Sequence, residues 1–587
     1  MPHPSPEPTP TPPQWPHCGH GTAPEDPVGC RGTLVPGNTA CLAHLADADR
    51  DTYLAGLTPG ADIDHRGTPF TESLLDVLLD ALRDPATGLP RLGDASFRSA
   101  IFQDDAWFGS AAFQATSTFQ GTADFGEATF QHRAQFGSVT FQGEAFFGCA
   151  TFQGEAEFGR ANFQRDAWFE SATFQHIGRF RSVTFQDIAG FRSAVFQRDA
   201  LFYHATFERD ARFEHATFER SANLGPLVCA SRVGLSGVSF NGPVTLSFAA
   251  RRLECRRTRW SSTAELRLRY ATVDFAHAVF EYPLTIAAEA DPFVLADGQP
   301  VEEPALAGAP DAMVRLASLH GVDAAHLVLA DVDLSGCQFI GAVHLDQLRL
   351  EGTCSFDSVP PHTHWRRWRP VRFTQRRTLA EEHHWRARQP AAVRGWNVAV
   401  LGTGHVGPAQ LAPLYRALRK GFEDGRNEPG AADFYYGEME MRRHDRIATT
   451  RAERGLLHGY WMLSGYGLRT TRALGWLAAA MLVTIVLLLG FGLPKDSPKQ
   501  EATGTVPHGG GKVTFEIDKA DPQNPTGSRF TGKRFEKALN VTLNSVVFRS
   551  SGQDLTTTGT YIEMASRVTE PVLLGLAVLA VRNRVKR

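Results

Sequence analysis

Three cysteines and a histidine near the N-terminus are residue types that bind metals. Cys18 and Cys30 each adjoin a glycine, and Cys41 and His44 are separated by two residues, which places both side chains on one turn. Three thiolates and one imidazole are typical of tetrahedral structural zinc. The sequence therefore predicts a structural zinc site at Cys18, Cys30, Cys41 and His44. Two alternatives stay open: His20 as the fourth ligand, and free thiols without a metal.

The composition and motif content argue against several other kinds of chemistry. The chain has 587 residues and a net charge of -3, so it is not a uniformly basic nucleic-acid binder. It contains no nucleophile motif, no P-loop and no placed pair of carboxylates. We therefore expect a protein that is not an enzyme and that does not bind nucleic acid.

An internal repeat dominates the first half of the chain, which holds most of its 40 phenylalanines. From Phe119 to Phe218 the aromatic positions alternate steps of six and five residues, which gives a period of eleven. Such steps would scatter the rings around an α-helix, so a coiled coil is excluded. Recurring Gly and Thr favour short strands and turns. We expect a solenoid with Phe pointing inward and a small Ala beside it.

A repeat unit reads ATFQGEAEFGR over residues 150–160. It resembles the pentapeptide-repeat family, whose unit is A-x-(L/F)-x-x. The resemblance implies a mainly β fold, a right-handed quadrilateral β-helix with two eleven-residue units in each coil. Residues 94–224 would form the regular β-helix, and residues 225–358 a degenerate extension. The departure from the family pattern is one extra residue in every second unit.

Ten of the phenylalanines are followed by Gln, which predicts surface columns of stacked amides that support the coils. The regular block is also acidic overall. Some members of the family mimic DNA and bind topoisomerases through an acidic β-helix. The resemblance therefore supplies one alternative function, a DNA-mimicking β-helix that binds a topoisomerase.

The segments before and after the repeat, up to the last part of the chain, differ in composition and in the structures that they predict. Residues 1–16 are rich in proline, which predicts a disordered tail. Residues 17–93 would form a small cap, with an amphipathic helix at residues 74–83 that covers the first coil. Residues 359–409 are expected to be a linker. Residues 410–446 show a helical pattern interrupted by glycines, which predicts a helical hairpin.

Two late segments predict a membrane anchor. Residues 473–493 carry no charge and match the roughly 20 apolar residues that span a bilayer. Residues 447–472 form a basic juxtamembrane segment, and residues 582–587 a basic tail, so both termini are expected in the cytoplasm. The second span, residues 561–581, carries Glu563, Arg567 and Glu570 on one helical face. The alternative is one span followed by an amphipathic surface helix.

The region between the two spans resembles the pore module of two-span ion channels. Residues 494–535 are polar and would form an extracytoplasmic loop, and residues 536–560 have the length of a re-entrant pore helix. The T-x-G-Y-G filter of that family is missing from the following residues. The resemblance is therefore to a degenerate module, and a channel-like oligomer gated by the solenoid is a second alternative function.

The repeat and the segment around residues 415–443 together resemble membrane-anchored bacterial pentapeptide-repeat proteins. The resemblance implies a bacterial cell-membrane protein with two spans, whose bulk lies in the cytoplasm. We expect a membrane-tethered scaffold or sensor that binds a cytoplasmic protein through its β-helix. A homo-oligomer could form through the transmembrane helices.

Overall fold

The computed structural model describes residues 12–109, 117–295, 297–309, 311–360, 364–366, 369–371, 373–390, 392–396, 406–495, 500–504, 509–511, 513, 516–519 and 522–585. The chain divides into two units, Met1–Val406 and Gly407–Arg587. The first unit is a parallel β-solenoid of about 11 turns, and the second is helical. The predicted fold class is thereby confirmed.

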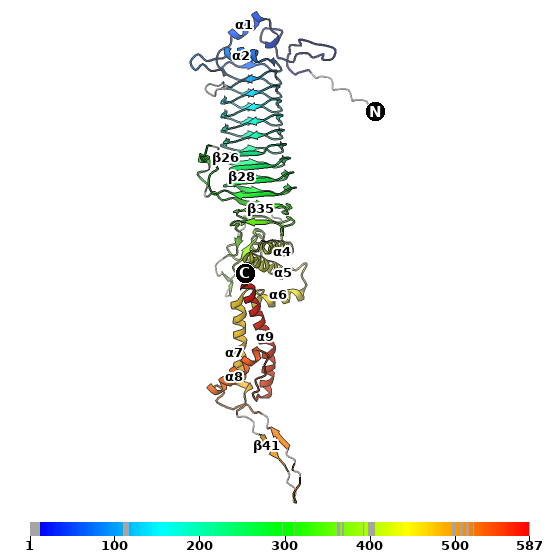
Figure 1. The fold of residues 1–587 in the computed structure, drawn as a ribbon, viewed down its shortest axis with the longest axis vertical. Helices are drawn as coiled ribbons and strands as arrows, with labels where there is room; N and C mark the ends of the chain where they lie inside the picture. Colours follow the sequence, from blue (N-terminus) through cyan, green and yellow to red (C-terminus); the bar gives the residue numbers. More distant parts are fainter. Residues whose placement is uncertain are drawn as a thin grey trace, which may run out of the picture. The chain divides into compact units, whose positions relative to one another are not determined.

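The solenoid consists of two-residue strands that stack in parallel on successive coils (Figure 1). Thr129 pairs with Thr151, and Thr151 pairs with Thr173, so one coil takes 22 residues and holds two repeat units. In each Thr-Phe strand the Phe is buried and the Thr points outward. In each strand that starts with Ala, the Ala is buried instead.

The strands line up in columns that correspond to the sides of a coil. The first column is β2 (Pro69–Phe70), β5 (Ile101–Phe102), β9 (Thr129–Phe130), β13 (Thr151–Phe152), β17 (Thr173–Phe174), β21 (Val195–Phe196), β25 (Thr217–Phe218), β27 (Ser239–Phe240), β29 (Arg259–Trp260) and β32 (Val279–Phe280). The second is β6 (Ala106–Trp107), β10 (Ala134–Gln135), β14 (Ala156–Glu157), β18 (Gly178–Arg179) and β22 (Ala200–Leu201).

The other two columns belong to one large sheet. The third column is β3 (Arg91–Leu92), β7 (Thr118–Phe119), β11 (Thr140–Phe141), β15 (Asn162–Phe163), β19 (Thr184–Phe185) and β23 (Thr206–Phe207). The fourth is β1 (Ile63–Asp64), β4 (Ala95–Ser96), β8 (Ala123–Asp124), β12 (Ala145–Phe146), β16 (Ala167–Trp168), β20 (Ala189–Gly190) and β24 (Ala211–Arg212).

The core of the regular block is a set of stacked phenylalanine rings. The ring of Phe152 is stacked between Phe130 at 4.9 Å and Phe174 at 4.8 Å. Rings of adjacent columns meet edge to face, as Phe152 and Phe158 do at 6.0 Å. Both geometries are favourable for aromatic pairs. The inward orientation of Phe predicted from the spacing is therefore what the structure shows.

Two kinds of turn alternate along the coil. The five-residue steps use a residue with a left-handed backbone, and the six-residue steps hold the extra residue after Phe-Gln. The left-handed residues recur every eleven positions at Glu127, Ser138, Cys149, Arg160, Ser171, Ser182, Ser193, His204 and His215. Because each turn type repeats with the period, the extra residue does not disturb the register of the faces.

The predicted amide ladder is wrong for the glutamines that the structure describes. Their backbone N–H groups donate to the coil before, as that of Gln142 does to the Phe119 carbonyl at 2.8 Å. Their side chains, however, make no Gln–Gln hydrogen bond between coils; Gln186 Nε2 donates to Asn162 Oδ1 instead. The backbone hydrogen bonds and the stacked rings therefore connect the coils.

The extension drops the extra residues. β26 (Asn223–Gly234) pairs with β28 (Val244–Glu254) through two irregularities, which reduce the offset between paired residues from 22 to 20. The next coil also has 20 residues, as the pairing of Arg259 with Val279 shows. The coil after it is longer, because the pairing of Leu284 with Leu327 encloses an inserted segment. The remaining strands are β30 (Ala264–Arg269), β31 (Thr272–Asp274), β33 (Leu284–Ala288), β34 (Arg315–Ser318), β35 (Leu327–Ala330) and β36 (Arg349–Glu351).

A segment between β33 and β34 covers part of the outer surface of the extension. Around η2 (Pro304–Leu306), it packs Phe293, Val301 and Leu306 on Val228 and Ala249. A buried ion pair fixes it, because Arg269 Nε and Nη2 contact the two carboxylate oxygens of Glu303 at 2.8 and 3.0 Å.

The solenoid begins earlier than the predicted boundary at residue 94. β1 pairs with β4 and β2 pairs with β5, which adds a coil that contains a single Phe, Phe70. Before it lie η1 (Leu42–His44) and α1 (Asp47–Ala55). The predicted capping helix is α2 (Glu72–Ala81), which buries Leu75, Leu78 and Leu79 and shields the end of the stack.

The opposite end of the solenoid is closed by a segment that we predicted to be linker. α3 (Ala380–Ala387) places the buried Glu381 carboxylate against the backbone N–H groups of Phe339 and Ile340, which the last coil would leave unpaired. Burial raises the pKa of Glu381 to about 7. The segment also contains β37 (Asp357–Ser358), β38 (His364–Arg366), β39 (Arg369–Val371) and β40 (Arg377–Thr378). Residues 359–409 are therefore partly a cap, because an exposed coil end needs its hydrogen bonds satisfied.

The second unit is a set of helices. They are α4 (Pro408–Asp424), α5 (Glu428–His444), α6 (Arg451–Ser464), α7 (Thr470–Leu487) with a π-helical continuation η3 (Leu488–Gly492), α8 (Gly532–Val546) and α9 (Thr557–Val585). β41 (Gln500–Thr503) and β42 (Glu516–Lys519) pair between η3 and α8. α4 and α5 form the predicted hairpin, with Phe422 against Phe434 at 4.9 Å. α6 was not predicted as a helix.

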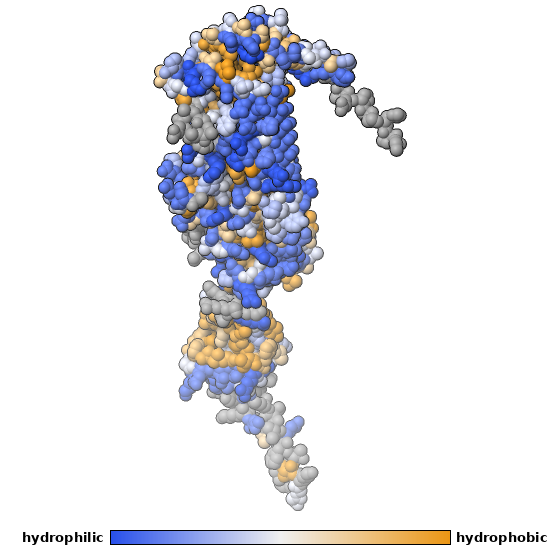
Figure 2. Space-filling model, turned by 45° about the horizontal axis from the view of Figure 1, so that its top comes forward, coloured by the Kyte–Doolittle hydropathy of each residue, from blue (hydrophilic) through white to orange (hydrophobic). Residues whose placement is uncertain are grey.

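Two helices of this unit are long and apolar enough to cross a membrane, at Thr470–Gly492 and Thr557–Arg582. Much of their surface is apolar and exposed, including Leu482, Val483, Val572 and Val578. Figure 2 shows apolar residues gathered in a band on this unit, with hydrophilic residues beyond it. Both helices coincide with the segments predicted as spans.

Candidate metal centre and groove of the solenoid

The four predicted metal ligands come together in the first unit. The ligand atoms of Cys18, Cys30, Cys41 and His44 all lie within 4.8 Å of one another. Sγ of Cys30 is 3.7 Å from Sγ of Cys41, and His44 Nδ1 is 3.3 Å and 3.6 Å from the sulfurs of Cys41 and Cys18. A tetrahedral zinc with ordinary bond lengths would separate two sulfurs by about 3.8 Å and sulfur from nitrogen by about 3.6 Å. The donor set and its spacing therefore fit zinc.

The backbone explains how ligands far apart in sequence converge. The chain folds back on itself, with Cys18 N–H donating to the Gly32 carbonyl at 2.9 Å and Gly19 N–H donating to the Cys30 carbonyl at 2.8 Å. Cys41 directly precedes η1, and His44 is the last residue of η1. Gly32 is required here, because a Cβ at that position would lie 2.8 Å from the Cys41 sulfur.

The thiols of the centre are electrostatically coupled. A hydrogen bond from Cys41 lowers the pKa of Cys30 to about 5, and the same contact raises the pKa of Cys41 above its ordinary value. The Gly32 N–H also donates to the Cys30 sulfur at 3.4 Å. The site thus favours one thiolate without a metal. His20, the alternative fourth ligand, stacks its ring on His44 at 4.2 Å.

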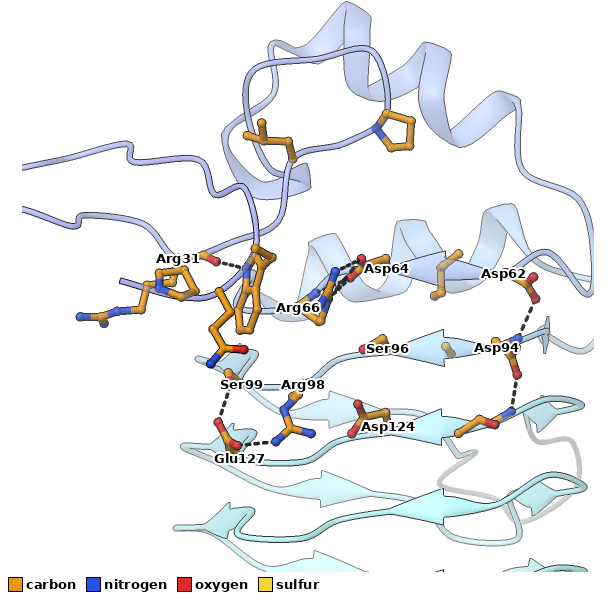
Figure 3. A pocket seen from close by; sticks show the side chains of 18 of the residues that line it. Arg31, Asp62, Asp64, Arg66, Asp94, Ser96, Arg98, Ser99, Asp124 and Glu127 are labelled. Carbon is orange, nitrogen blue, oxygen red and sulfur yellow. Dashed lines mark hydrogen bonds and ion pairs between the residues drawn. The ribbon is translucent and has the colours of Figure 1, made fainter. Parts of the chain in front are cut away.

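A groove of about 1170 Å3 lies beside this centre (Figure 3). Trp15 forms one wall; its indole N–H donates to the Arg31 carbonyl at 2.9 Å, and its ring lies 5.0 Å from the Arg66 guanidinium. Arg66 is in turn bound to both carboxylate oxygens of Asp64. The wall is therefore an aromatic ring held by a charged pair, which can contact both apolar and polar groups.

The floor of the groove is built by the outward side chains of the fourth column. Asp64, Ser96 and Asp124 follow one another in register on β1, β4 and β8. At the rim, Arg98 Nη2 donates to Glu127 at 2.6 Å, which lowers the pKa of Glu127. Acids and arginines alternate, so the groove is polar with both signs of charge.

The same column continues into two outward aromatic side chains. Phe146 on β12 pairs with Asp124 on one side and with Trp168 on β16 on the other. Both rings are half-buried. Trp168 lies over Gly190 of the next coil, where a Cβ would be 2.6 Å from the ring. We call the outward residues Asp64, Ser96, Asp124, Phe146 and Trp168 the groove face.

Sequence reasoning missed the groove face because its aromatic residues stand beside the repeat phenylalanines. A signal was present in Ala145-Phe146-Phe147 and Ala167-Trp168-Phe169. In both, an aromatic residue occupies the position after Ala that most units fill with a polar residue or glycine, the other apolar cases being Trp107 and Leu201 in another column. Since strand residues alternate between faces, that position points outward.

The helical unit contains a polar site between the two candidate spans. The carboxylate of Glu570 is fully buried and accepts a hydrogen bond from Thr484 Oγ1 at 2.8 Å. On α9, Arg567 Nε lies 3.8 Å from Glu563 Oε1, as their position on one helical face allows. Glu570 thus faces protein rather than the outer surface, as buried polar groups of membrane helices do.

α8, the predicted re-entrant segment, is tied to the end of the first candidate span. Arg534 donates to the carbonyls of Leu489, Leu493 and Pro494 at 2.8 to 3.2 Å. Ala538 and Val541 of α8 also pack in one apolar cluster with residues of α7 and η3, among them Ile485 and Leu488. These bonds satisfy carbonyls that the end of a helix leaves open.

The coil geometry and the repeating Phe can be compared with known protein families. Residues 180–225 match the family model for pentapeptide repeats (9 copies). The matched stretch runs from Phe180 into β26 and so covers regular pentapeptide-repeat coils. No curated protein and no solved structure gave a significant match. The chain thus contains a pentapeptide-repeat solenoid, a scaffold type of fold, and two candidate membrane helices.

Proposed function

We propose that the chain is a membrane-tethered pentapeptide-repeat scaffold that binds a cytoplasmic protein through the groove face. The observation that carries this proposal is the outward pair Phe146 and Trp168, in register with a groove on the same column. Neither ring is needed for the Phe stack. Aromatic residues beside a groove with satisfied ion pairs are the composition typical of protein interfaces.

The charges of the groove face favour a protein partner over the alternative of DNA mimicry. Arg66 and Arg98 stand among the acids of the groove, each in contact with a carboxylate. A nucleic-acid mimic needs a surface of one sign that resembles a row of phosphates. A protein partner with an apolar anchor and mixed charges matches the groove face better.

Site-specific photocrosslinking in cells tests the partner proposal. A photoreactive residue is placed at Trp168 in the full-length protein, and at Trp107 in a matched control. Trp107 is also an outward, half-buried tryptophan, but it lies on β6 in another column. We expect a discrete protein adduct from position 168 and none from position 107. Equal adducts from both positions, or none from 168, would contradict the proposal.

For the membrane topology we propose two spans with both termini in the cytoplasm. The arginines of residues 442–472 lie before α7 or in its first turn, and the last residues of the chain are basic again. A bacterial inner membrane is the proposed location. A topology reporter fused after Arg587 is expected to be active only on the cytoplasmic side. Activity on the outer side would contradict the two-span topology.

The Cys and His cluster is proposed to hold a structural zinc that fixes the cap at the start of the solenoid. The donor spacing given above supports this proposal. Cys30→Ser should lose stoichiometric zinc in elemental analysis. Cys149→Ser is the matched control, because Cys149 is exposed at a turn position that is Ser in the next two coils, at Ser171 and Ser193. Equal zinc content in the two variants would refute the site.

A channel-like oligomer is the second candidate function. It is favoured by α8, a short helix between two apolar helices, and by the buried Glu570. Ion flux through the full-length protein in liposomes tests it, with a deletion of residues 536–560 as control. Flux that disappears with the deletion supports a channel. Without flux in the intact protein, α8 serves as part of the anchor.

A further inference from the structure

The outer face of α6 carries apolar side chains that nothing in the described residues covers. Leu456 is 76% exposed and Met462 is 48% exposed, and Ile447, just before the helix, is 91% exposed. The opposite face packs Leu457, Tyr460 and Trp461 on the cluster of Tyr436, Met439 and Tyr466. α6 therefore buries one apolar side and exposes the apolar side chains of Leu456 and Met462 among small and polar residues.

The position of α6 relative to α7 is fixed by hydrogen bonds. α6 ends at Gly465, whose left-handed backbone (φ 55°) turns the chain, and α7 begins five residues later. Arg472 Nη1 donates to the Trp461 carbonyl at 2.8 Å, and the Trp476 indole N–H donates to the Met462 carbonyl at 3.0 Å. The first turns of α7 thus cap the end of α6, and α6 runs across the start of the candidate span (Figure 1).

The arginines around α6 divide into an internal and an external group. Arg442 contacts Glu453, Arg443 contacts Glu440, and Arg454 donates to the carbonyls of Asp445 and Thr449. Arg446 and Arg451, by contrast, are exposed. They flank Ile447 at the start of the apolar outer face, so positive charge and exposed apolar surface lie together.

The geometry points to α6 as an interfacial helix that binds the headgroup layer of an anionic lipid bilayer. Ile447, Leu456 and Met462 enter the boundary of the acyl chains, and Arg446 and Arg451 bind lipid phosphates. This inference rests on the proposed membrane placement of α7.

A lipid surface fits this face better than a second copy of the chain. The face continues directly into a candidate span, so it lies within one short turn of the bilayer boundary. Symmetric pairing of two such faces would bring Arg446 and Arg451 of both copies onto one interface, where like charges repel. An anionic headgroup layer neutralises them instead.

The test places benzoylphenylalanine at Leu456 in the full-length protein, reconstituted in vesicles of phosphatidylcholine alone or mixed with phosphatidylglycerol. Glu428 is the control position, because it is exposed at the first residue of α5, about 24 Å along that helix from His444. After irradiation, mass spectrometry should find a lipid adduct at 456 and none at 428. The yield should be at least about fivefold higher with phosphatidylglycerol, and Arg446→Glu with Arg451→Glu should remove that gain.

Several results would overturn the inference. A chain-to-chain adduct at 456 would assign the face to a second copy. Equal yields at 456 and 428, or a yield at 456 that ignores lipid charge and the arginine variants, would exclude an anionic headgroup layer. Flotation of the same vesicles separates this failure from a failure of tethering. Protein that floats without an adduct at 456 overturns only the role of α6, whereas protein that does not float overturns the membrane placement as well.

Discussion

Replacing Phe152 with Ala should open the middle of the solenoid locally. The Phe152 ring is fully buried and is stacked between Phe130 and Phe174, with Phe158 against its edge. Truncation of a buried Phe to Ala costs about 3 to 5 kcal/mol, since it removes apolar contacts and leaves a cavity. The narrow interior is fixed by rings on every side, so little collapse can fill the space.

The loss should be concentrated in the coils that touch the cavity, because each coil of a solenoid contacts only its neighbours. Hydrogen exchange of the full-length protein, read by mass spectrometry, measures local opening. Amides of β9, β13 and β17 should lose protection by roughly a hundredfold or more. Those of β29, several coils away, should change little. Gln153→Ala is the control, because Gln153 is the exposed neighbour of the same ring.

Unchanged protection at β13 in Phe152→Ala would refute the stacked-ring core. A uniform loss over all coils would refute the nearest-neighbour description of the stack, because it would mean that the solenoid opens as one body. A loss in Gln153→Ala as large as in Phe152→Ala would show that the turns, and not the rings, hold the coils together.

Three further perturbations address the cap, the spans and the outer segment. Burial raises the pKa of Glu381 from 4.5 to about 7, so its carboxyl group ionises at a lower pH in the undocked chain than in the docked one. The free energy of α3 docking should therefore fall by about 3 kcal/mol between pH 4.5 and 7. Hydrogen exchange of the α3 amides at several pH values measures this dependence, which should vanish in Glu381→Gln. Gly559→Val should separate the two apolar helices, because a Cβ there would lie 2.3 Å from the Gly492 carbonyl oxygen. The yield of chemical crosslinks between α7 and α9 should therefore fall. Gly575→Val is the control and should leave the yield unchanged, because the space around Gly575 is open. Glu303→Ala should leave Arg269 buried without its carboxylate partner and destabilise the packing of the outer segment by about 3 to 5 kcal/mol. Proteolysis within residues 289–314 should therefore accelerate. An unchanged rate of proteolysis would contradict the role of the pair.

The sequence was sufficient for the backbone and core features that repeat, although not for the side-chain contacts of the repeated glutamines. Phe at alternating steps of six and five residues predicts inward rings and a period of eleven. The coil of two such units was implied by the resemblance to pentapeptide repeats. The four candidate metal ligands were predicted from residue type and from the short spacing of Cys41 and His44. Their convergence depends on the fold of residues 17–44, which the structure supplies.

The features that occur once could not be predicted in the same way. The first coil has a single Phe, so it gave no periodic signal, and the boundary was placed too late. The docking of Glu381 on the last coil depends on a contact between residues about 40 positions apart. The groove face is a further case, since it needs the register between coils to place Asp124, Phe146 and Trp168 in one line.

Binding of the crosslinked partner to purified variants tests the central claim most directly. Truncation of a buried tryptophan at the centre of an interface costs about 2 kcal/mol or more, so Trp168→Ala should weaken the partner's affinity by roughly thirtyfold. Phe146→Ala should weaken it as well, and Trp107→Ala should leave it unchanged. An affinity that is the same for the wild type, Trp168→Ala and Trp107→Ala would contradict binding through the groove face.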